Sequence, residues 1–281
     1  MIRFGLQIPS FTFDVPTSAL FERISEIANA AEESGFSSIW VMDHLYQLPM
    51  IGGPAHPMLE GYSTLAAIAA RTSKVELGTL VTGVTYRNPA FLGKVVTTLD
   101  VISAGRAILG IGAAWHDVEH AAFGFDFPSV PERMERLEEA VQICRAMFDE
   151  EVSSFDGKHY RTKELRSVPR PVRRIPIMVG GGGEKKTLRL VAKYADMSNF
   201  FGDPAGIKHK VEVLRAHCDD VGRDPGDITI SRLGTLPDDE SAVAPEAKAL
   251  ADAGARYLIY NMHDISPEKV ARTAKILSSL N

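Results

Sequence analysis

Ala107-Ile-Leu-Gly-Ile-Gly-Ala-Ala-Trp-His116 is a short apolar run that ends in small residues, an aromatic residue and a histidine. The segment Ile175-Pro-Ile-Met-Val-Gly-Gly-Gly-Gly-Glu184 repeats this arrangement later in the chain. In both segments, a run typical of a buried strand leads into bare backbone just before a helix. Two such strand ends indicate a ligand that lies across several strand ends of one sheet.

The rest of the chain repeats this alternation of one-sided helices and apolar strands. The predicted strands are Ile2–Ile8, Ser38–Met42, Val75–Val81, Ala107–Ile111, Pro176–Val179, Asp196–Phe200, Ile228–Leu233 and Arg256–Tyr260. Eight strands that alternate with helices predict an α/β fold, a (β/α)8 TIM barrel, with a doubly wound open sheet as the alternative. We expect residues 1–281 to form one domain of this kind.

Residues 149–175, before the fifth predicted strand, are too many for a simple turn. We expect an excursion from the barrel here. Its Phe155-Asp-Gly-Lys-His-Tyr160 stretch predicts a short hairpin, which we expect to cover one mouth of the barrel.

Composition narrows the class of protein. A net charge of −5 argues against a nucleic-acid-binding surface, which needs clustered Lys and Arg. No apolar run approaches the length of a membrane-spanning helix, and the first residues resemble a strand and not a signal sequence. Cys144 and Cys218 fall at apolar helix positions, as is typical of reduced core cysteines. We therefore expect a cytoplasmic protein without a membrane anchor.

Barrel enzymes place their active sites at the carboxyl ends of the strands. Gln7 lies at the carboxyl end of the first predicted strand, and Asp43-His44 follow the second. At a strand end, the titratable imidazole of His44 can transfer or stabilise a proton. The alternative is a structural histidine.

Gly180–Gly183 precede Glu184 and a helical run. Free backbone N–H groups beside the positive end of a helix favour an anion, so this loop predicts a phosphate site. No Lys-Ser or Lys-Thr closes it, which excludes a Walker loop. A flexible loop without a ligand is the alternative.

His116, Glu119 and His120 match an inverted zincin motif, in which two histidines hold zinc beside a glutamate base. No third ligand is evident in the sequence. The competing interpretation is the start of a helix, with Trp115 and His116 lining the barrel mouth. We expect no metal, and a zinc hydrolase is kept as an alternative.

At these motifs the chain resembles the luciferase-like monooxygenase superfamily, and within it the deazaflavin-dependent oxidoreductases. The resemblance rests on motifs in a fixed order over most of the chain: Ser38–His44, Leu77–Pro89, Thr98–His120, Phe123–Pro128, Arg133–Ala140 and Gly180–Asp196. It implies a barrel that holds coenzyme F420, or alternatively FMN, at the carboxyl ends of its strands. It also implies a homodimer.

The resemblance implies roles for individual residues. A non-prolyl cis peptide bond between Leu80 and Val81 would back the tricyclic ring of the cofactor. Gly181, Gly182 and Gly183 would hold its phosphate, and His44 would lie beside the reactive ring carbon. The residues expected to contact the ring and the ribityl chain are Asp43, Gly112, Ala113 and Ala114.

Four positions depart from the family pattern. One is Leu80, because a small residue is common at the first position of the cis bond. Sugar-phosphate dehydrogenases of this family carry an acidic residue where this chain has Trp115 and a tryptophan where it has Leu48. We therefore do not expect their substrate here. Ala114 replaces the second glycine of the usual Gly-x-Gly-Ala-Gly-Trp pattern.

The hypothesis is an F420-dependent oxidoreductase that transfers a hydride between the deazaflavin C5 and a small organic substrate. His44 would stabilise charge or move the accompanying proton. Gln7, Tyr46 and Trp115 would shape the substrate side. The alternatives are an FMN-dependent luciferase-like monooxygenase and a deazaflavin-binding protein without catalytic activity.

Overall fold

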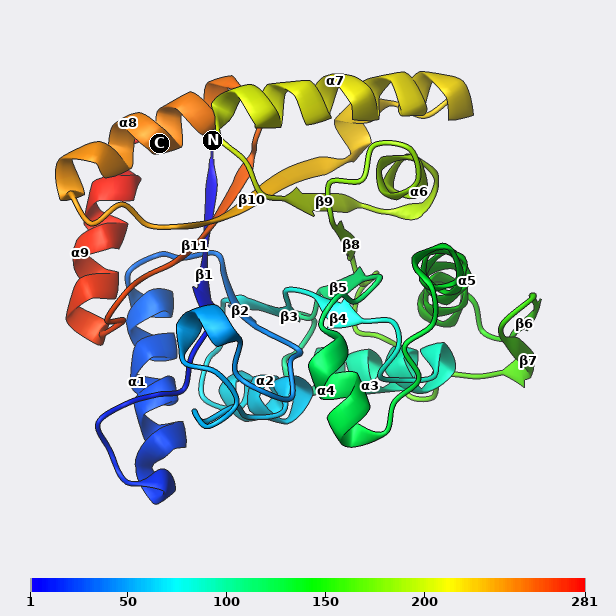
Figure 1. Cartoon of the computed structure of the whole chain (residues 1–281), viewed down its shortest axis with the longest axis horizontal. Coiled ribbons are helices and arrows are strands. Elements are labelled where there is room, and N and C mark those ends of the chain that lie inside the picture. The colour runs from blue at the N-terminus through cyan, green and yellow to red at the C-terminus, as the bar shows by residue number, and fades with distance from the viewer. Residues whose placement is uncertain (1, 281) are drawn as a thin grey trace.

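Parallel strands form an inner barrel that helices surround in the computed structural model, which describes residues 2–280 (Figure 1). The barrel strands are β1 (Arg3–Ile8), β2 (Ser38–Val41), β3 (Glu76–Thr79), β4 (Thr82–Gly83), β5 (Leu109–Gly112), β8 (Ile177–Gly180), β9 (Met197–Phe200), β10 (Thr229–Thr235) and β11 (Tyr257–Asn261). Their order in the sheet is β3-β2-β1-β11-β10-β9-β8-β5-β4.

The third predicted strand is split in two. β3 and β4 are separated by a cis peptide bond between Leu80 and Val81, as the family resemblance implied. β3 also bonds the start of the next strand, since Leu77 N–H donates to Arg106 C=O and Ile108 N–H to Leu77 C=O, both at 2.9 Å. β4 continues the pairing with β5. The sheet therefore closes, which confirms the (β/α)8 barrel and excludes the doubly wound alternative.

The helices pack on the outside of the barrel, as the one-sided apolar patterns predicted (Figure 1). They are α1 (Leu20–Glu33), α2 (Gly61–Ala69), α3 (Pro89–Ile102), α4 (Asp117–Phe123), α5 (Val130–Asp149), α6 (Thr187–Tyr194), α7 (Pro204–Val221), α8 (Glu240–Asp252) and α9 (Pro267–Ser278). Three short 3-10 helices are η1 (Thr17–Ala19), η2 (Pro49–Ile51) and η3 (Pro225–Asp227).

Large side chains fill the interior of the barrel below its mouth. Trp40 and Tyr257 are fully buried there, with ring centroids 6.4 Å apart in an edge-on arrangement. Trp40 Nε1 donates to Ser38 Oγ at 2.5 Å. The interior is therefore a packed core and not a pore, and space for ligands lies at the carboxyl ends of the strands.

The segment before the fifth barrel strand forms the predicted hairpin, from β6 (Ser153–Asp156) and β7 (Arg161–Leu165). The prediction that it covers a barrel mouth is wrong: the hairpin lies beside α5, on the outside of the barrel (Figure 1). The reason is Glu139 of α5, whose carboxylate accepts hydrogen bonds from the backbone N–H groups of Lys158, His159 and Tyr160. Sequence patterns predict a hairpin but not the surface that it contacts.

Cys144 and Cys218 are free thiols buried in the core, as predicted. No helix within residues 2–280 is long and apolar enough to cross a membrane. The predicted domain limits, residues 1 and 281, lie outside the described residues.

Candidate active site

Two cavities meet at the carboxyl end of the barrel. The first has a volume of about 310 Å³ and is lined by the ends of β2, β4, β5, β8 and β9. The second, of about 780 Å³, lies toward the ends of β1, β10 and β11. The residues that line both cavities are His44, Leu80, Trp115, Phe201 and Leu233.

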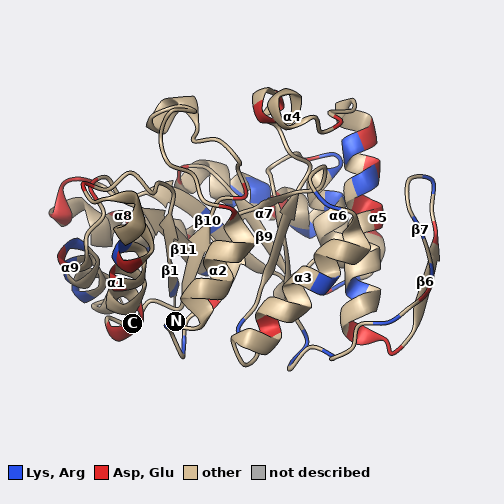
Figure 2. Ribbon diagram, turned by 90° about the horizontal axis from the view of Figure 1, so that it is seen from below, with Lys and Arg blue, Asp and Glu red and all other residues tan. Residues whose placement is uncertain are grey.

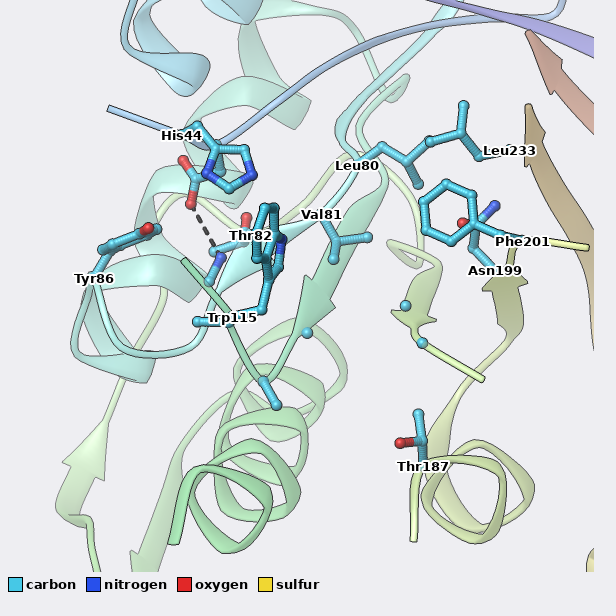
Figure 3. A pocket seen from close by; sticks show the side chains of 17 residues that line it. His44, Leu80, Val81, Thr82, Tyr86, Trp115, Thr187, Asn199, Phe201 and Leu233 are labelled. Carbon is cyan, nitrogen blue, oxygen red and sulfur yellow. Dashed lines mark hydrogen bonds between the residues drawn. The ribbon is translucent and has the colours of Figure 1, made fainter. Parts of the chain in front are cut away.

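Most of the predicted site residues line these cavities. In the first they are Asp43, His44, Leu80, Val81, Gly112, Ala113, Ala114, Trp115 and Gly181. Gln7 lines the second. Figure 3 shows His44 and Trp115 on one side of the first cavity and Asn199, Phe201 and Leu233 on the other, with Val81 between them.

The chain bends at Leu80-Val81, between β3 and β4, and we call this bend the bulge. Val81 of the bulge lies against bare backbone. A Cβ atom on Gly112 would lie 2.9 Å from Val81 Cγ2, and one on Gly180 would lie 2.8 Å from it. Beyond the bulge, Thr82 Oγ1 hydrogen-bonds Tyr62 Oη and Thr79 Oγ1, each at 2.6 Å. The glycines thus leave room for Val81, and buried hydroxyl groups fix the strand that follows it.

Asp43 is a buried carboxylate at the end of β2. Its Oδ2 accepts hydrogen bonds from Arg87 Nη1 at 2.7 Å and from Gly83 N–H at 3.3 Å. Burial raises the pKa of Asp43 to about 6 although the charge of Arg87 opposes this shift. Asp43 Oδ1 is also buried and has no hydrogen-bond partner among the described residues, so it can accept a bond from a ligand in the cavity that Asp43 lines.

Glu119 of α4 fixes the ring of His44 through a hydrogen bond. The carboxylate is fully buried; its Oε1 accepts a hydrogen bond from His44 Nδ1 at 2.6 Å and its Oε2 one from Leu45 N–H at 2.7 Å. Tyr86 Oη also donates to Oε1. Burial alone would raise the pKa of Glu119, but the hydrogen bonds from His44 and Tyr86 outweigh it and lower the pKa to about 2. Glu119 is therefore ionised and orients His44.

The glycine loop after β8 presents free donors. Gly181 has a positive φ of 116°, which glycine adopts readily, and its N–H donates to Asn199 C=O at 2.9 Å. The backbone N–H groups of residues 182–186 donate no hydrogen bond to the described part of the chain. They precede the N-terminus of α6, so the loop suits an anion such as phosphate.

Lys210 of α7 adds a positive charge to this loop. A Cβ atom on Gly182 would lie 3.5 Å from Lys210 Cε, and Lys210 Nζ binds Glu184 Oε1 at 2.5 Å. Glu184 also pairs with His209 Nε2 at 3.0 Å. The acidic residue of the loop is therefore neutralised by its neighbours. Gly182 and Gly183 lie beyond the lining of the first cavity, along the path from Gly181 to α6.

The second cavity is mostly apolar. Its lining includes Phe13, Met42, Leu48, Met50, Ile51, Leu80, Trp115, Phe201, Leu233, Met262 and Ile265. At the ends of β1 and β11, Asn261 Nδ2 donates to Gln7 Oε1 at 3.2 Å. No Lys or Arg of the described chain lines this cavity. The second cavity therefore suits an apolar molecule with an uncharged polar group.

The three residues of the zinc alternative do not converge. Glu119 serves His44, while both ring nitrogens of His120 have other partners: Nδ1 hydrogen-bonds His116 C=O at 2.7 Å, and Nε2 lies 2.6 Å from Thr85 Oγ1. No group of three potential ligands that could hold a metal occurs within residues 2–280. These contacts argue against the zinc hydrolase.

Tyr46 differs from its predicted position. It lines neither cavity; its ring packs against Phe123, with centroids 5.3 Å apart, and its backbone N–H lies 3.2 Å from Glu119 Oε2. Thr82, Gly83, Gly180 and Asn199, which lie at the carboxyl ends of predicted strands, also line the first cavity. The prediction missed four further lining residues: Tyr86, Thr187, Phe201 and Leu233.

The fold and the site define a (β/α)8 barrel with a ligand-binding mouth. The chain belongs to the luciferase-like monooxygenase family, whose model matches residues 2–276. It is 37% identical over 174 residues to the F420-dependent glucose-6-phosphate dehydrogenase of Kineococcus radiotolerans, over 62% of this chain and 49% of that protein. The chain thus spans about half the length of the curated relatives it matches.

Solved structures share the whole fold. An F420-dependent secondary alcohol dehydrogenase in complex with an F420-acetone adduct aligns with a TM-score of 0.85 at 18% identity, over 100% of this chain and 99% of that chain. A monooxygenase from Streptomyces bottropensis aligns with a TM-score of 0.77 at 22% identity, over 99% and 98%. At these identities, the likeness concerns the fold.

Proposed function

We propose that this protein is an F420-dependent oxidoreductase that transfers a hydride between C5 of the deazaflavin and an organic substrate in the second cavity. The observation that carries the proposal is the place of His44, whose side chain lines both cavities while a buried carboxylate fixes its Nδ1. The F420-dependent dehydrogenase among the relatives supports the choice of cofactor.

The residues of the first cavity fit a deazaflavin with a phosphate. Val81 and the bulge offer an apolar wall for one face of a planar ring, and the unpartnered Asp43 Oδ1 offers an acceptor to a ring or ribityl donor. The free N–H groups of residues 182–186 and Lys210 would hold the phosphate. When bound, the cofactor supplies the hydride donor or acceptor.

His44 accepts or donates the proton that accompanies the hydride. Ionised Glu119 accepts a hydrogen bond at His44 Nδ1, so the neutral imidazole carries its proton there and has a free acceptor at Nε2. In alcohol oxidation, Nε2 removes the hydroxyl proton. In carbonyl reduction, the imidazolium returns a proton from the same atom.

The second cavity favours an uncharged substrate. A phosphate monoester buried there would face a mostly apolar lining, the Gln7–Asn261 amide pair and the carboxylate of Asp264, without a lysine or arginine from the described residues. Among the lining residues, only the imidazoles of His44 and His263 can carry a positive charge. An alcohol or carbonyl compound with an apolar body would bury that body against the lining and offer one polar group to the amides. We therefore propose a neutral substrate, unlike the sugar phosphate named for the relatives.

The test is a parallel titration of the purified protein with F420 and with FMN, followed by assays with neutral alcohols, aldehydes and enones. The proposal predicts micromolar or tighter F420 binding, weaker FMN binding and a change in deazaflavin absorbance with at least one substrate. Tighter binding of FMN, with oxygen consumption, would instead show a flavin monooxygenase. Tight F420 binding without turnover of any compound would show a carrier.

A further inference from the structure

Tyr86 and His44 share one carboxylate oxygen. Tyr86 Oη donates a hydrogen bond to Glu119 Oε1, the atom that also accepts the bond from His44 Nδ1 at 2.6 Å. Figure 3 shows Tyr86 and His44 on the same side of the first cavity. Glu119 belongs to α4, which lies at the top of Figure 2 with acidic residues in red. The oxygen that orients His44 therefore serves a second side chain as well.

The carboxylate of Glu119 has four hydrogen-bond donors within residues 2–280. Its other oxygen, Oε2, accepts bonds from the backbone N–H groups of Leu45 at 2.7 Å and Tyr46 at 3.2 Å. Each donor stabilises the negative charge and leaves less of it for the others. The bonds to Oε2 come from the backbone, so a side-chain substitution does not remove them. Among the described residues, Tyr86 is thus the side chain that competes with His44 for this carboxylate.

The ring of Tyr86 is fixed independently of its hydroxyl group. It stacks on the buried imidazole of His120, with ring centroids 4.7 Å apart and 25° between the planes. It also lies close to Gly83, where a Cβ atom would be 2.7 Å from Tyr86 Cε2. Burial raises the pKa of Tyr86, and the bond to Glu119 raises it further, so the hydroxyl group keeps its proton and remains a donor. Tyr86→Phe therefore removes one donor and leaves the ring packing in place.

We propose that Tyr86 is a positioning residue that lowers the basicity of His44 Nε2 by sharing Glu119 Oε1. This inference rests on the proposed function, in which Nε2 accepts or donates the proton that accompanies the hydride. A carboxylate that served His44 alone would stabilise the imidazolium more strongly and hold the proton on Nε2. General acid–base catalysis is most efficient when the pKa of the group lies near the working pH. Tyr86 would thus keep His44 able both to accept and to donate the proton.

Other titratable or charged groups surround His44, and Tyr86→Phe changes none of them. They are Asp43 and Arg87 beside the first cavity, His116 before α4, with a ring centroid 5.8 Å from that of His44, His120 of α4, and His263 and Asp264 on the lining of the second cavity. A difference between the wild type and this variant therefore reports the Tyr86 hydroxyl group.

The test is an NMR titration of the His44 ring in the whole chain, which measures its proton affinity without turnover. The signal is assigned by its loss in His44→Ala, and the variants compared are Tyr86→Phe and Glu119→Gln. Tyr194→Phe is the matched control, because Tyr194 Oη donates to Glu138 Oε1 at 3.3 Å, between α6 and α5 and outside both cavities. The pH dependence of kcat/KM for alcohol oxidation with F420 is the second measurement.

We expect Tyr86→Phe to raise the proton affinity of His44 about threefold to tenfold and Glu119→Gln to lower it. The first variant leaves more negative charge for His44 Nδ1, whereas the second removes that charge. The acidic limb of the kcat/KM profile, where His44 becomes protonated, should move to higher pH in Tyr86→Phe, and the control should match the wild type.

Two results would overturn the inference alone. One is an unchanged or lower proton affinity of His44 in Tyr86→Phe. The other is a loss of kcat/KM in this variant that is the same at every pH, as a merely structural role would give. If the wild type turned over no substrate with F420, the proposed function would be wrong. The NMR titration would still decide whether Tyr86 lowers the basicity of His44.

Discussion

The two sides of the barrel mouth are built from different chemistry. The side at the ends of β2 to β8 has bare backbone, the buried Asp43–Arg87 ion pair and the Glu119–His44 pair. The side at the ends of β1, β10 and β11 has mostly apolar side chains around one pair of amides, and its lining also includes His263 and Asp264. Fixed charges and free N–H groups suit a cofactor with charged groups, whereas the apolar side suits a neutral substrate. His44 faces both.

The largest expected effect is at the residue that the two sides share. His44→Ala should lower turnover about a hundredfold to ten-thousandfold, because no other group takes the proton at Nε2. Its F420 affinity should stay close to that of the wild type, as measured by titration. His56→Ala is the matched control, since His56 is exposed and lines neither cavity. Equal turnover in the His44 variant and the control would remove His44 from the reaction.

The pH dependence of the stability of the fold tests whether Glu119, on the charged side of the mouth, is ionised. Its pKa in the folded protein, about 2, lies below the ordinary value of 4.5, so the ionised carboxylate stabilises the fold above pH 4.5. That contribution, up to about 3 kcal/mol, is lost as the pH falls from 4.5 toward 2. Denaturant unfolding at several pH values should show this slope in the wild type and a shallower one in Glu119→Gln. Identical slopes would contradict an ionised Glu119.

A pair of substitutions at one glycine tests the anion loop. A Cβ atom on Gly182 would meet nothing nearer than 3.5 Å, so the fold has room for the Cβ atom of either variant. Gly182→Asp brings a like charge to the phosphate site and should weaken F420 binding about a hundredfold, whereas Gly182→Ala should change it little. Affinity is measured by fluorescence titration. A similar loss in both variants would indicate that the loop is sensitive to volume and not to charge.

The smallest expected effect concerns the apolar side. A neutral alcohol that the enzyme oxidises should have a kcat/KM at least about tenfold higher than its phosphorylated counterpart, because the phosphate would be buried without a lysine or arginine from the described residues. Steady-state assays with both compounds give the ratio. If the phosphorylated compound were the better substrate, the proposal that the second cavity binds a neutral substrate would be wrong.

The alternation of strands and helices was enough to predict the barrel, because each one-sided helix must bury its apolar face on a sheet. The ends of the strands then indicated His44 and the glycine loop. The cis bond at Leu80–Val81 came from the family resemblance and not from the residues themselves. The homodimer stays a prediction.

Contacts between distant segments could not be predicted in this way. Glu119 was predicted only as part of a zinc motif. Its contact with His44 was not predicted, because His44 lies 75 residues earlier in the chain. Arg87 and Asp43 are 44 residues apart. The same limit explains the hairpin, whose position depends on Glu139 of α5. Local periodicity does not specify which carboxylate meets which donor once the barrel closes.

A crystal structure with F420 bound is the most direct test of the division between the two sides. We predict that the deazaflavin ring lies in the 310 Å³ cavity against Val81, with its phosphate on the N–H groups of residues 182–186 and C5 facing the second cavity near His44. A ring in the second cavity, or a phosphate away from this loop, would contradict the account.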